Sequence, residues 1–294
     1  MKNNKNCLVT VIGGSGFIGS HVADQLTDDG YQVRILDRKD SPWKRKDQEM
    51  IVGDLLDVDL LNKSIVGSDL VYNFAALADI DQARNKPIET IEINILGNAR
   101  VLEACRVNSV KRYMFASTVY VYSREGSFYR CSKQAAENYV EEYQRIYNLD
   151  YTILRYGSLY GPRADPQNGL FRIVKTALDA GVVRYNGSPD ALREYIHVED
   201  AAKSSVDVIR DEFRNQSIVL TGQESMRVAD LLKMLAEILG FSESVEFVGE
   251  EYPGHYIRTP YAYLPKLGRK YVAPCHVDLG QGLIQLIDEV RRNQ

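Results

Sequence analysis

The chain has 294 residues, is 45% hydrophobic, and carries 36 Lys and Arg against 40 Asp and Glu, a formal net charge of −4. This length suits one large domain or two joined ones, and the absence of a basic excess argues against nucleic acid as a partner. Its four cysteines lack metal-ligand spacing and no apolar stretch approaches the ~20 residues of a membrane span, so we expect a soluble cytoplasmic protein with free thiols and no metal site.

Short β-rich runs alternate with helical periodicity through the first half of the chain. Strands are predicted at residues 7–13, 31–37, 49–54, 69–76, 111–118 and 150–157. Helices are predicted at residues 17–30, 57–66, 87–108 and 129–148. Strands that alternate with helices of this length form right-handed βαβ units, in which helices cover both faces of a parallel sheet. The predicted fold class is therefore doubly wound α/β.

The turn from the first strand into the first helix carries a glycine motif. In "VIGGSGFIGSH", Gly13, Gly16 and Gly19 have GxxGxxG spacing. A helix N-terminus with free N–H groups binds pyrophosphate, and the glycines let the backbone come close to it. Asp37, at the end of the second strand, is placed to accept hydrogen bonds from a ribose 2′-hydroxyl. Its charge favours NAD over NADP, although the adjacent Arg38 weakens that preference.

Two later segments extend this predicted dinucleotide site. Asp54 follows the third strand, where an adenine amino group would lie, and a helix cap is its alternative role. Small residues follow the fourth strand at Ala75, Ala76 and Ala78, where bulk would collide with a dinucleotide. Packing of these alanines in the core is the alternative.

The pattern loosens after Gly161, where proline and glycine interrupt it. A helix is predicted at 170–180, mixed strand and helix at 193–210, a strand at 217–222, and amphipathic helices at 227–240 and 280–292. We predict an NAD-binding Rossmann domain at residues 1–160 and a smaller α/β substrate lobe at 161–294. Segments around 193–222 are expected to return to the sheet.

Tyr129 and Lys133 lie four residues apart at a helix start and so share one face. Lowering a tyrosine pKa from 10 toward 7 takes about 4 kcal/mol of preference for the phenolate. A cation ~4 Å away at an effective dielectric near 20 supplies about that much, and a nicotinamide ring adds a second positive charge. Lys133 is therefore expected to activate Tyr129 as a base. Thr118, at the end of the fifth strand, can hydrogen-bond the same substrate oxygen. The three residues predict alcohol–ketone redox chemistry.

Several segments together carry a family resemblance that covers most of the chain. They are "GGSGFIGSH", "GDLLD", "NFAA", "NILGNARVLEAC", "FASTVYVYS", "YRCSK", "LRYGSLYGPR" and "REYIHVEDAA". In these the chain resembles the extended short-chain dehydrogenase/reductase family, in its branch of NAD-dependent nucleotide-sugar epimerases and dehydratases, which includes the UDP-galactose 4-epimerases.

The resemblance implies roles for individual residues. Tyr129 corresponds to the base, Lys133 to its partner and Thr118 to the hydroxyl. Asn94 matches an asparagine that orders the catalytic region, with a buried helix amide as its alternative. The predicted cofactor contacts also include Ser15, Phe17, Ile18, Arg38, Leu55, Asn94, Tyr129, Lys133 and Tyr156.

A nucleotide-sugar is the substrate that the resemblance implies. Arg193 matches an arginine that meets the pyrophosphate, with Tyr195 beside it, and a guanidinium suits phosphate oxygens. Asn168 resembles an asparagine that contacts the diphosphate. His197 is expected to be a structural hydrogen-bonding residue. The resemblance further implies a homodimer formed through the helices at 87–108 and 129–148.

The chain departs from the family pattern at four places. Tyr252 stands where a phosphate-binding arginine is expected, and Arg258 is the residue that would compensate. Gly157 and Ser158 replace a common Phe-Asn pair. Val119 and Tyr120 replace the Asp-Glu pair of classical 4,6-dehydratases. The loop from Tyr122 to Tyr129 has six residues, where relatives have about twenty.

These features favour an NAD-dependent nucleotide-sugar 4-epimerase that oxidises the sugar transiently at C4. The alternative is a dehydratase, oxidase or 4-ketoreductase that acts on the same substrate class. A non-catalytic NAD-binding regulator is a third reading, but such a protein would not need Thr118, Tyr129 and Lys133.

Overall fold

The computed structural model describes residues 6–223, 225–241, 245–248 and 257 of the chain. The chain divides into two compact units, Met1–Tyr263 and Leu264–Gln294. The second unit, which includes the predicted helix at 280–292, lies outside the described residues.

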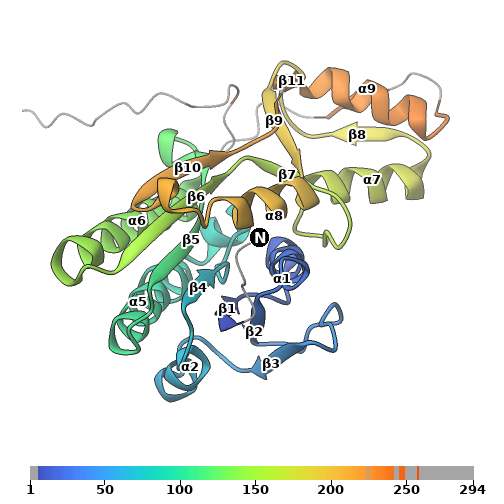
Figure 1. Cartoon of the computed structure of the whole chain (residues 1–294). Coiled ribbons are helices and arrows are strands. Elements are labelled where there is room, and N and C mark those ends of the chain that lie inside the picture. The colour runs from blue at the N-terminus through green and yellow to red at the C-terminus, as the bar shows by residue number, and fades with distance from the viewer. Residues whose placement is uncertain (1–5, 224, 242–244, 249–256, 258–294) are drawn as a thin grey trace, which may run out of the picture. The chain divides into compact units, whose positions relative to one another are not determined.

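A seven-stranded parallel sheet forms the centre of the first unit, with the order β10-β6-β5-β4-β1-β2-β3 (Figure 1). Its strands are β1 (Leu8–Ile12), β2 (Gln32–Asp37), β3 (Gln48–Val52), β4 (Leu70–Asn73), β5 (Arg112–Thr118), β6 (Asp150–Tyr156) and β10 (Gln216–Leu220). The first six follow the strand order typical of a dinucleotide-binding sheet. β10 comes from the second half of the chain and pairs with β6. The predicted domain boundary at residue 160 stays a prediction.

Helices cover both faces of this sheet, which confirms the doubly wound α/β prediction. One face packs against α1 (Phe17–Asp28) and α8 (Val198–Asp207), with Val22 and Leu26 in its core. The other packs against α2 (Val58–Ile65), α5 (Asn98–Val107) and α6 (Ser127–Tyr147). Both faces of β5 are therefore covered, and all seven of its residues are buried.

The predicted helix at 87–108 is not one regular helix. It consists of α4 (Pro87–Ile91), a π-helical segment η2 (Glu92–Gly97) and α5. A further short helix, α3 (Ile80–Asn85), was not expected and is N-capped by Asp79. The π segment carries Asn94, and π turns within helices often occur at functional sites.

The second half of the chain builds two small sheets beyond β6. One contains β7 (Ser158–Tyr160), β9 (Leu192–His197) and β11 (Ser225–Arg227), and the other contains β8 (Val183–Tyr185) and β12 (Val245–Phe247). α7 (Gly169–Ala180) and α9 (Val228–Ile238) supply residues to a core that includes Ala177, Val183 and Leu232. The three-residue strands β7, β8, β11 and β12 had no separate prediction.

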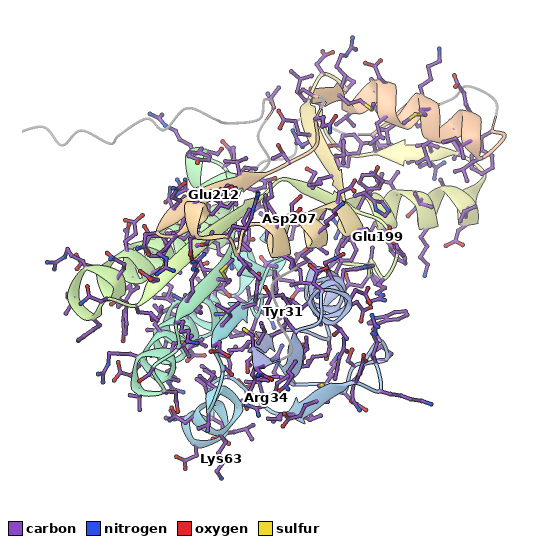
Figure 2. The ribbon with its side chains drawn as sticks, viewed as in Figure 1. Tyr31, Arg34, Lys63, Glu199, Asp207 and Glu212 are labelled. Carbon is purple, nitrogen blue, oxygen red and sulfur yellow. The ribbon has the colours of Figure 1, made fainter. Side chains whose placement is uncertain are left out.

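Arg34 ties β2 to the end of α2. Its guanidinium donates to the carbonyls of Ser64 and Val66 and pairs with Glu49 on β3. Figure 2 labels Arg34 on β2 and Lys63 on α2. These contacts lie away from the carboxyl ends of the strands.

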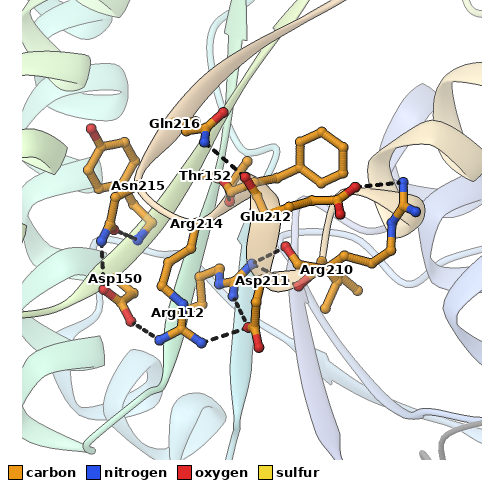
Figure 3. Close-up of polar contacts among 12 residues, drawn as sticks. Arg112, Asp150, Thr152, Arg210, Asp211, Glu212, Arg214, Asn215 and Gln216 are labelled. Atoms are coloured by element: carbon orange, nitrogen blue, oxygen red, sulfur yellow. Dashed lines mark hydrogen bonds and ion pairs between the residues drawn. The ribbon is translucent and has the colours of Figure 1, made fainter.

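Arg112 lies at the amino-terminal ends of the strands, on the edge of the sheet opposite to the carboxyl ends where the pockets lie. Its buried guanidinium donates to the carbonyls of Ile209 and Arg210 and to the carboxylate of Asp211, at the 3-10 segment η4 (Asp211–Phe213) (Figure 3). Arg214 joins Asp211 to Asp150 at the start of β6. A surface hollow of about 620 Å³ lies here, and its charged side chains are paired with one another.

Three cysteines in the described part of the chain, Cys7, Cys105 and Cys131, are free thiols. No helix among the described residues has both the length and the apolar character to cross a bilayer.

Candidate active site

A pocket of about 160 Å³ opens where the first four strands of the sheet end. It is lined by Ile12, Gly13, Gly16, Leu36, Asp37, Arg38, Gly53, Asp54, Leu55, Phe74, Ala75, Ala76 and Ile93. Eight of the predicted cofactor residues are therefore brought together around one space. We refer to it as the dinucleotide pocket.

The glycines of the first turn allow a close approach of backbone segments. Gly13 has a φ of +79°, and a Cβ there would lie 2.6 Å from the amide nitrogen of Ala75. A Cβ on Gly19 would lie 2.3 Å from the carbonyl oxygen of Gly13. Only glycine fits both positions, because any side chain would push the β1 turn away from α1 or from the end of β4.

The N-terminus of α1 faces this turn without a side-chain cap. Its N-cap residue is Gly16, and the first turn of the helix contains no acidic residue. Unpaired N–H groups and the positive end of the helix dipole make such a terminus an anion site. The glycine turn and this helix end together fit the pyrophosphate of a dinucleotide.

Asp37 holds the glycine turn from the side. Its carboxylate accepts hydrogen bonds from the backbone N–H groups of Ser15 and Lys39. The Ser15 hydroxyl donates to the carbonyl of Lys39, which fastens the two loops to each other. Phe17 packs its ring edge-to-face on His21, and neither Phe17 nor Ile18 lines the dinucleotide pocket.

The structure distinguishes the two roles considered for Asp54. The N-cap of α2 is Asp57, whose side chain accepts from Leu60 N–H. Asp54 instead accepts from Leu56 N–H and lines the dinucleotide pocket. A contact between Asp54 and the cofactor stays a prediction, but the helix-cap alternative is wrong.

A larger pocket of about 650 Å³ lies between the ends of β5 and β6 and the second half of the chain. We refer to it as the substrate pocket. Its lining includes the predicted residues Thr118, Tyr129, Tyr156, Asn168, Arg193 and Tyr195, together with Ala78, Asp79, Tyr120, Arg172 and Tyr185. Residues far apart in the sequence are thus gathered around one cavity.

The predicted catalytic residues meet at one wall of this pocket. The Tyr129 phenol is hydrogen-bonded to the Thr118 side chain. The Lys133 ammonium donates to the carbonyl of Ala116 at 2.8 Å and lies 5.9 Å from the centroid of the Tyr129 ring. It also lies 4.8 Å from the centroid of the Phe115 ring, a cation–π contact.

The pKa of Tyr129 differs from the sequence-based expectation. Burial raises the pKa of the phenol to about 12, while its hydrogen bond with Thr118 acts in the opposite direction. Burial also lowers the pKa of Lys133 to about 8, against the charge of Glu137, which raises it. Desolvation is thus the largest effect on the Tyr129 pKa in the chain by itself, and its activation by Lys133 together with a bound nicotinamide stays a prediction.

Asn94 acts on the site through other residues. Its amide oxygen accepts from the N–H of Leu77 at 2.7 Å. Its amide nitrogen donates to the Leu77 carbonyl and to the Ser132 hydroxyl. The buried side chain thus fastens the loop after β4 to α6, next to Lys133. This geometry fits a positioning residue, and both donor hydrogens of the amide are already used within the chain.

The predicted substrate residues have structural partners as well. Asn168 caps α7 by accepting from Phe171 N–H, and its amide nitrogen donates to the carbonyl of Leu159. Arg193 is buried and donates to the Leu192 carbonyl. Tyr156, predicted as a cofactor contact, shares a hydrogen bond between its hydroxyl and that of Ser205. Arg258 and Tyr252 lie outside the described residues.

Sequence reasoning missed a buried group behind the predicted catalytic residues. Glu137 on α6 forms a two-point ion pair with Arg155 on β6. Ser117, adjacent to Thr118, donates its hydroxyl hydrogen to the same carboxylate. The available signal was a charged residue, Arg155, at the end of the apolar run of β6, but the spacing along the chain does not identify Glu137 as its partner.

Comparison with known proteins gives a consistent picture. The family model described as "NAD dependent epimerase/dehydratase family" matches residues 9–220. A UDP-N-acetyl-alpha-D-glucosaminuronate decarboxylase of Bacillus cytotoxicus is 26% identical over 87% of this chain and 88% of its own.

Solved structures extend the likeness to three dimensions. The UDP-glucose 4-epimerase of Thermotoga maritima, solved with UDP-glucose, superposes with a TM-score of 0.80 at 26% identity, covering 87% of this chain and 90% of that one. The UDP-glucose 4-epimerase of Thermus thermophilus, solved with NAD, gives a TM-score of 0.77 at 27% identity, covering 89% of this chain and 95% of that one.

Proposed function

We propose, from the premise that the chain belongs to the NAD-dependent epimerase/dehydratase family, that it is a nucleotide-sugar 4-epimerase. The observation that carries the proposal is the hydrogen-bonded pair of Thr118 and Tyr129, with Lys133 behind it, at the wall of the substrate pocket. A sugar hydroxyl placed against this wall meets the Tyr129 oxygen, which accepts its proton in the phenolate form, and the Thr118 hydroxyl, which can relay that proton.

The cofactor of the family is NAD, and bound NAD supplies a hydride acceptor and returns the hydride. In this chain Gly13, Gly16 and Gly19 would hold its pyrophosphate, and Asp37 would hold its adenosine ribose. The Lys133 ammonium would bind the second ribose and stabilise the phenolate of Tyr129. Thr118 would share the proton that leaves the sugar hydroxyl.

The other end of the substrate pocket has the chemistry of a nucleotide site. Arg193 and Arg172 line it, and guanidinium groups suit the oxygens of a diphosphate. Tyr185 and Tyr195 add aromatic rings to the same lining. We therefore infer a nucleotide-sugar whose sugar lies at Thr118 and Tyr129 and whose diphosphate lies toward Arg193.

Epimerisation is favoured over dehydration by the residues that follow Thr118. Val119 is buried and apolar, and Tyr120 lines the pocket where a dehydratase would present a carboxylic acid. Loss of water needs an acid to protonate the leaving hydroxyl. The phenol of Tyr120 is the feature that keeps a dehydratase as the second candidate.

A panel of UDP-, GDP-, CDP- and dTDP-sugars incubated with the purified protein and NAD tests the proposal. An epimerase gives a product of unchanged mass and inverted configuration at C4, read by mass spectrometry and proton NMR. A product lighter by one water identifies a dehydratase instead. If the protein binds NAD but converts none of the sugars, the epimerase proposal fails and a non-catalytic NAD-binding regulator is the remaining interpretation.

We also propose that the protein is a cytoplasmic homodimer. Apolar side chains on the outer surface of α4, η2 and α6 are exposed, among them Ile88, Ile91, Leu96, Tyr139 and Ile146. A patch of this kind is typical of a protein–protein interface. Light scattering on a size-exclusion column should give twice the chain mass, and Ile91→Asp should return the protein to a monomer.

A further inference from the structure

The Glu137–Arg155 ion pair is buried directly behind the catalytic residues. The guanidinium donates from Nε to one carboxylate oxygen at 3.0 Å and from Nη2 to the other at 2.6 Å. The side chains of Glu137 and Arg155 are 8% and 15% exposed. This two-point geometry is the strongest form of the Arg–carboxylate contact.

Two further side chains bind this pair. The Ser117 hydroxyl donates to Glu137 at 2.5 Å, and the third guanidinium nitrogen of Arg155 donates to the Tyr122 hydroxyl. The Tyr122 ring also lies 4.8 Å from the guanidinium carbon. The four residues come from β5, α6, β6 and the 3-10 segment η3 (Val119–Tyr122). Tyr122 therefore anchors the start of the short β5–α6 connection.

Stability alone does not account for such a pair. Removing two charges from water costs several kcal/mol, and well-packed apolar residues often stabilise a core as well or better. A buried pair with satisfied hydrogen bonds does, however, fix the positions of the elements that carry it. Here those elements are the end of β5, which carries Thr118, and the first half of α6, which carries Tyr129 and Lys133.

The carboxylate also acts on Lys133 through its charge. Glu137 follows Lys133 by four residues on α6 and so lies on the same face of the helix. Burial lowers the pKa of Lys133 to about 8, and the negative charge of Glu137 counteracts that shift. The other ionisable groups around this part of α6 include Tyr129 and Glu141 on the same helix, Tyr122 in η3, and Tyr151 and Arg155 in β6. Tyr122 and Arg155 contact each other at the far side of the pair.

We propose that Glu137 is a positioning residue of the active site, which keeps Lys133 in its charged form and fixes the strand end that carries Thr118, with Arg155 as its counter-ion. The proposal rests on the proposed role of Lys133 in binding the cofactor. It adds a residue that touches neither cofactor nor substrate.

The pH dependence of NAD affinity tests this proposal without a substrate. In the native protein, affinity should fall as Lys133 loses its proton, with an inflection near pH 8. In Glu137→Gln the inflection should move to lower pH by on the order of one unit, because a negative charge near the ammonium is gone. Isothermal titration calorimetry across the pH range measures both.

Matched variants separate the possible causes. Glu142→Gln removes the same charge from the solvent face of the same helix, where Glu142 pairs with Arg145, and should leave the inflection in place. Glu137→Gln/Arg155→Gln leaves neither member of the ion pair buried without its partner, so it replaces the single variant if that variant does not fold. A folded variant without Glu137 that titrates like the native protein overturns the proposal.

A Lys133→Met control keeps this result distinct from the proposed function. If the inflection persists in Lys133→Met, the titration of Lys133 is not its cause, and the proposed role of Lys133 in binding the cofactor is wrong. If the inflection disappears in Lys133→Met but does not move in Glu137→Gln, the role of Lys133 stands and the role of Glu137 fails.

Discussion

The Lys133 ammonium lies 5.9 Å from the centroid of the Tyr129 ring, on the same face of α6. At this separation the cation does not offset the burial of the phenol, whose pKa is raised to about 12. A base that works near neutral pH needs a much lower value. For the proposed role of Tyr129 as the base, the remaining stabilisation of the phenolate therefore has to come with the ligand.

This relationship predicts a ligand-dependent titration of Tyr129. Without NAD, the difference in near-ultraviolet absorbance between the native protein and Tyr129→Phe should show no phenolate between about pH 6 and 9. With NAD, whose nicotinamide is positively charged, the phenolate signal should appear within that range. Tyr129→Phe should still bind NAD and lose turnover by a factor on the order of 10²–10⁴.

Two outcomes would contradict this prediction. Native turnover in Tyr129→Phe would show that the phenol takes no part in the reaction. A phenolate signal that is the same with and without NAD means that the chain alone sets the pKa.

We expect Lys133 to lower the stability of the folded chain while it serves the binding of NAD. Its pKa in the folded chain is about 8, below the 10.5 of an ordinary lysine, so the unfolded state binds more protons between those two pH values. The contribution of Lys133 to the free energy of unfolding therefore rises as the pH increases from about 8 to 10.5 and is least favourable below pH 8.

Lys133→Met should accordingly be more stable than the native protein at pH 7, by about 1–2 kcal/mol after the loss of the hydrogen bond to Ala116. Urea unfolding at several pH values measures the difference, which should shrink as the pH increases through that window. The variant should bind NAD more weakly. A lower stability for Lys133→Met at pH 7 than for the native protein would show that the polar contacts of the ammonium outweigh its burial.

The glycine turn allows a test with a closely matched control. Gly13 and Gly30 both have positive φ, +79° and +84°, but a Cβ on Gly13 meets Ala75 N at 2.6 Å whereas one on Gly30 meets nothing within 4 Å. Alanine should cost about 1–2 kcal/mol of stability at either site through the backbone alone.

Gly13→Ala should also abolish NAD binding, because the turn must move away from β4, whereas Gly30→Ala should keep the native affinity. Fluorescence titration with NADH and thermal unfolding measure the two effects separately. Equal affinities in the two variants would mean that the close approach at Gly13 does not shape the dinucleotide pocket.

The sequence predicts the sites that depend on local spacing. Gly13 lies in the turn after β1 and Gly19 in the first turn of α1, while Tyr129 and Lys133 are one helical turn apart, so the proximity within each pair follows from turn and helix geometry. The parallel order of the sheet follows from the alternation of strands and helices. These predictions need no knowledge of tertiary contacts.

Other features depend on packing and were out of reach. Glu137 and Arg155 meet because α6 lies on β6, and the raised pKa of Tyr129 follows from burial that the spacing does not reveal. The π segment at Asn94 interrupts a sequence with unbroken helical periodicity, and the side chain's bonds to Leu77 and Ser132 account for its place. Three-residue strands such as β7 are too short for a periodic pattern.

A substitution of Arg112, at the amino-terminal edge of the sheet, should lower the stability of the protein without changing its activity. Arg112 is 4% exposed, and its guanidinium satisfies the carbonyls of Ile209 and Arg210 and the Asp211 carboxylate (Figure 3). Arg112→Met keeps most of the side-chain volume but removes the donor to the Ile209 carbonyl, while the Arg210 carbonyl keeps the N–H of Phe213 and Asp211 keeps Arg214. A buried acceptor without a partner costs about 1–3 kcal/mol, and a loss of about that size is expected.

Arg112 stands at the start of β5 and Thr118 at its end, so the length of the strand separates the variant from the catalytic residues. NAD affinity and turnover at a temperature where the variant is folded should therefore match the native values, while the midpoint of urea unfolding falls. Arg214→Met is the matched control, because its guanidinium is about half exposed and water replaces its partners at little cost. Reduced turnover in folded Arg112→Met would show that the two edges of the sheet are coupled through β5.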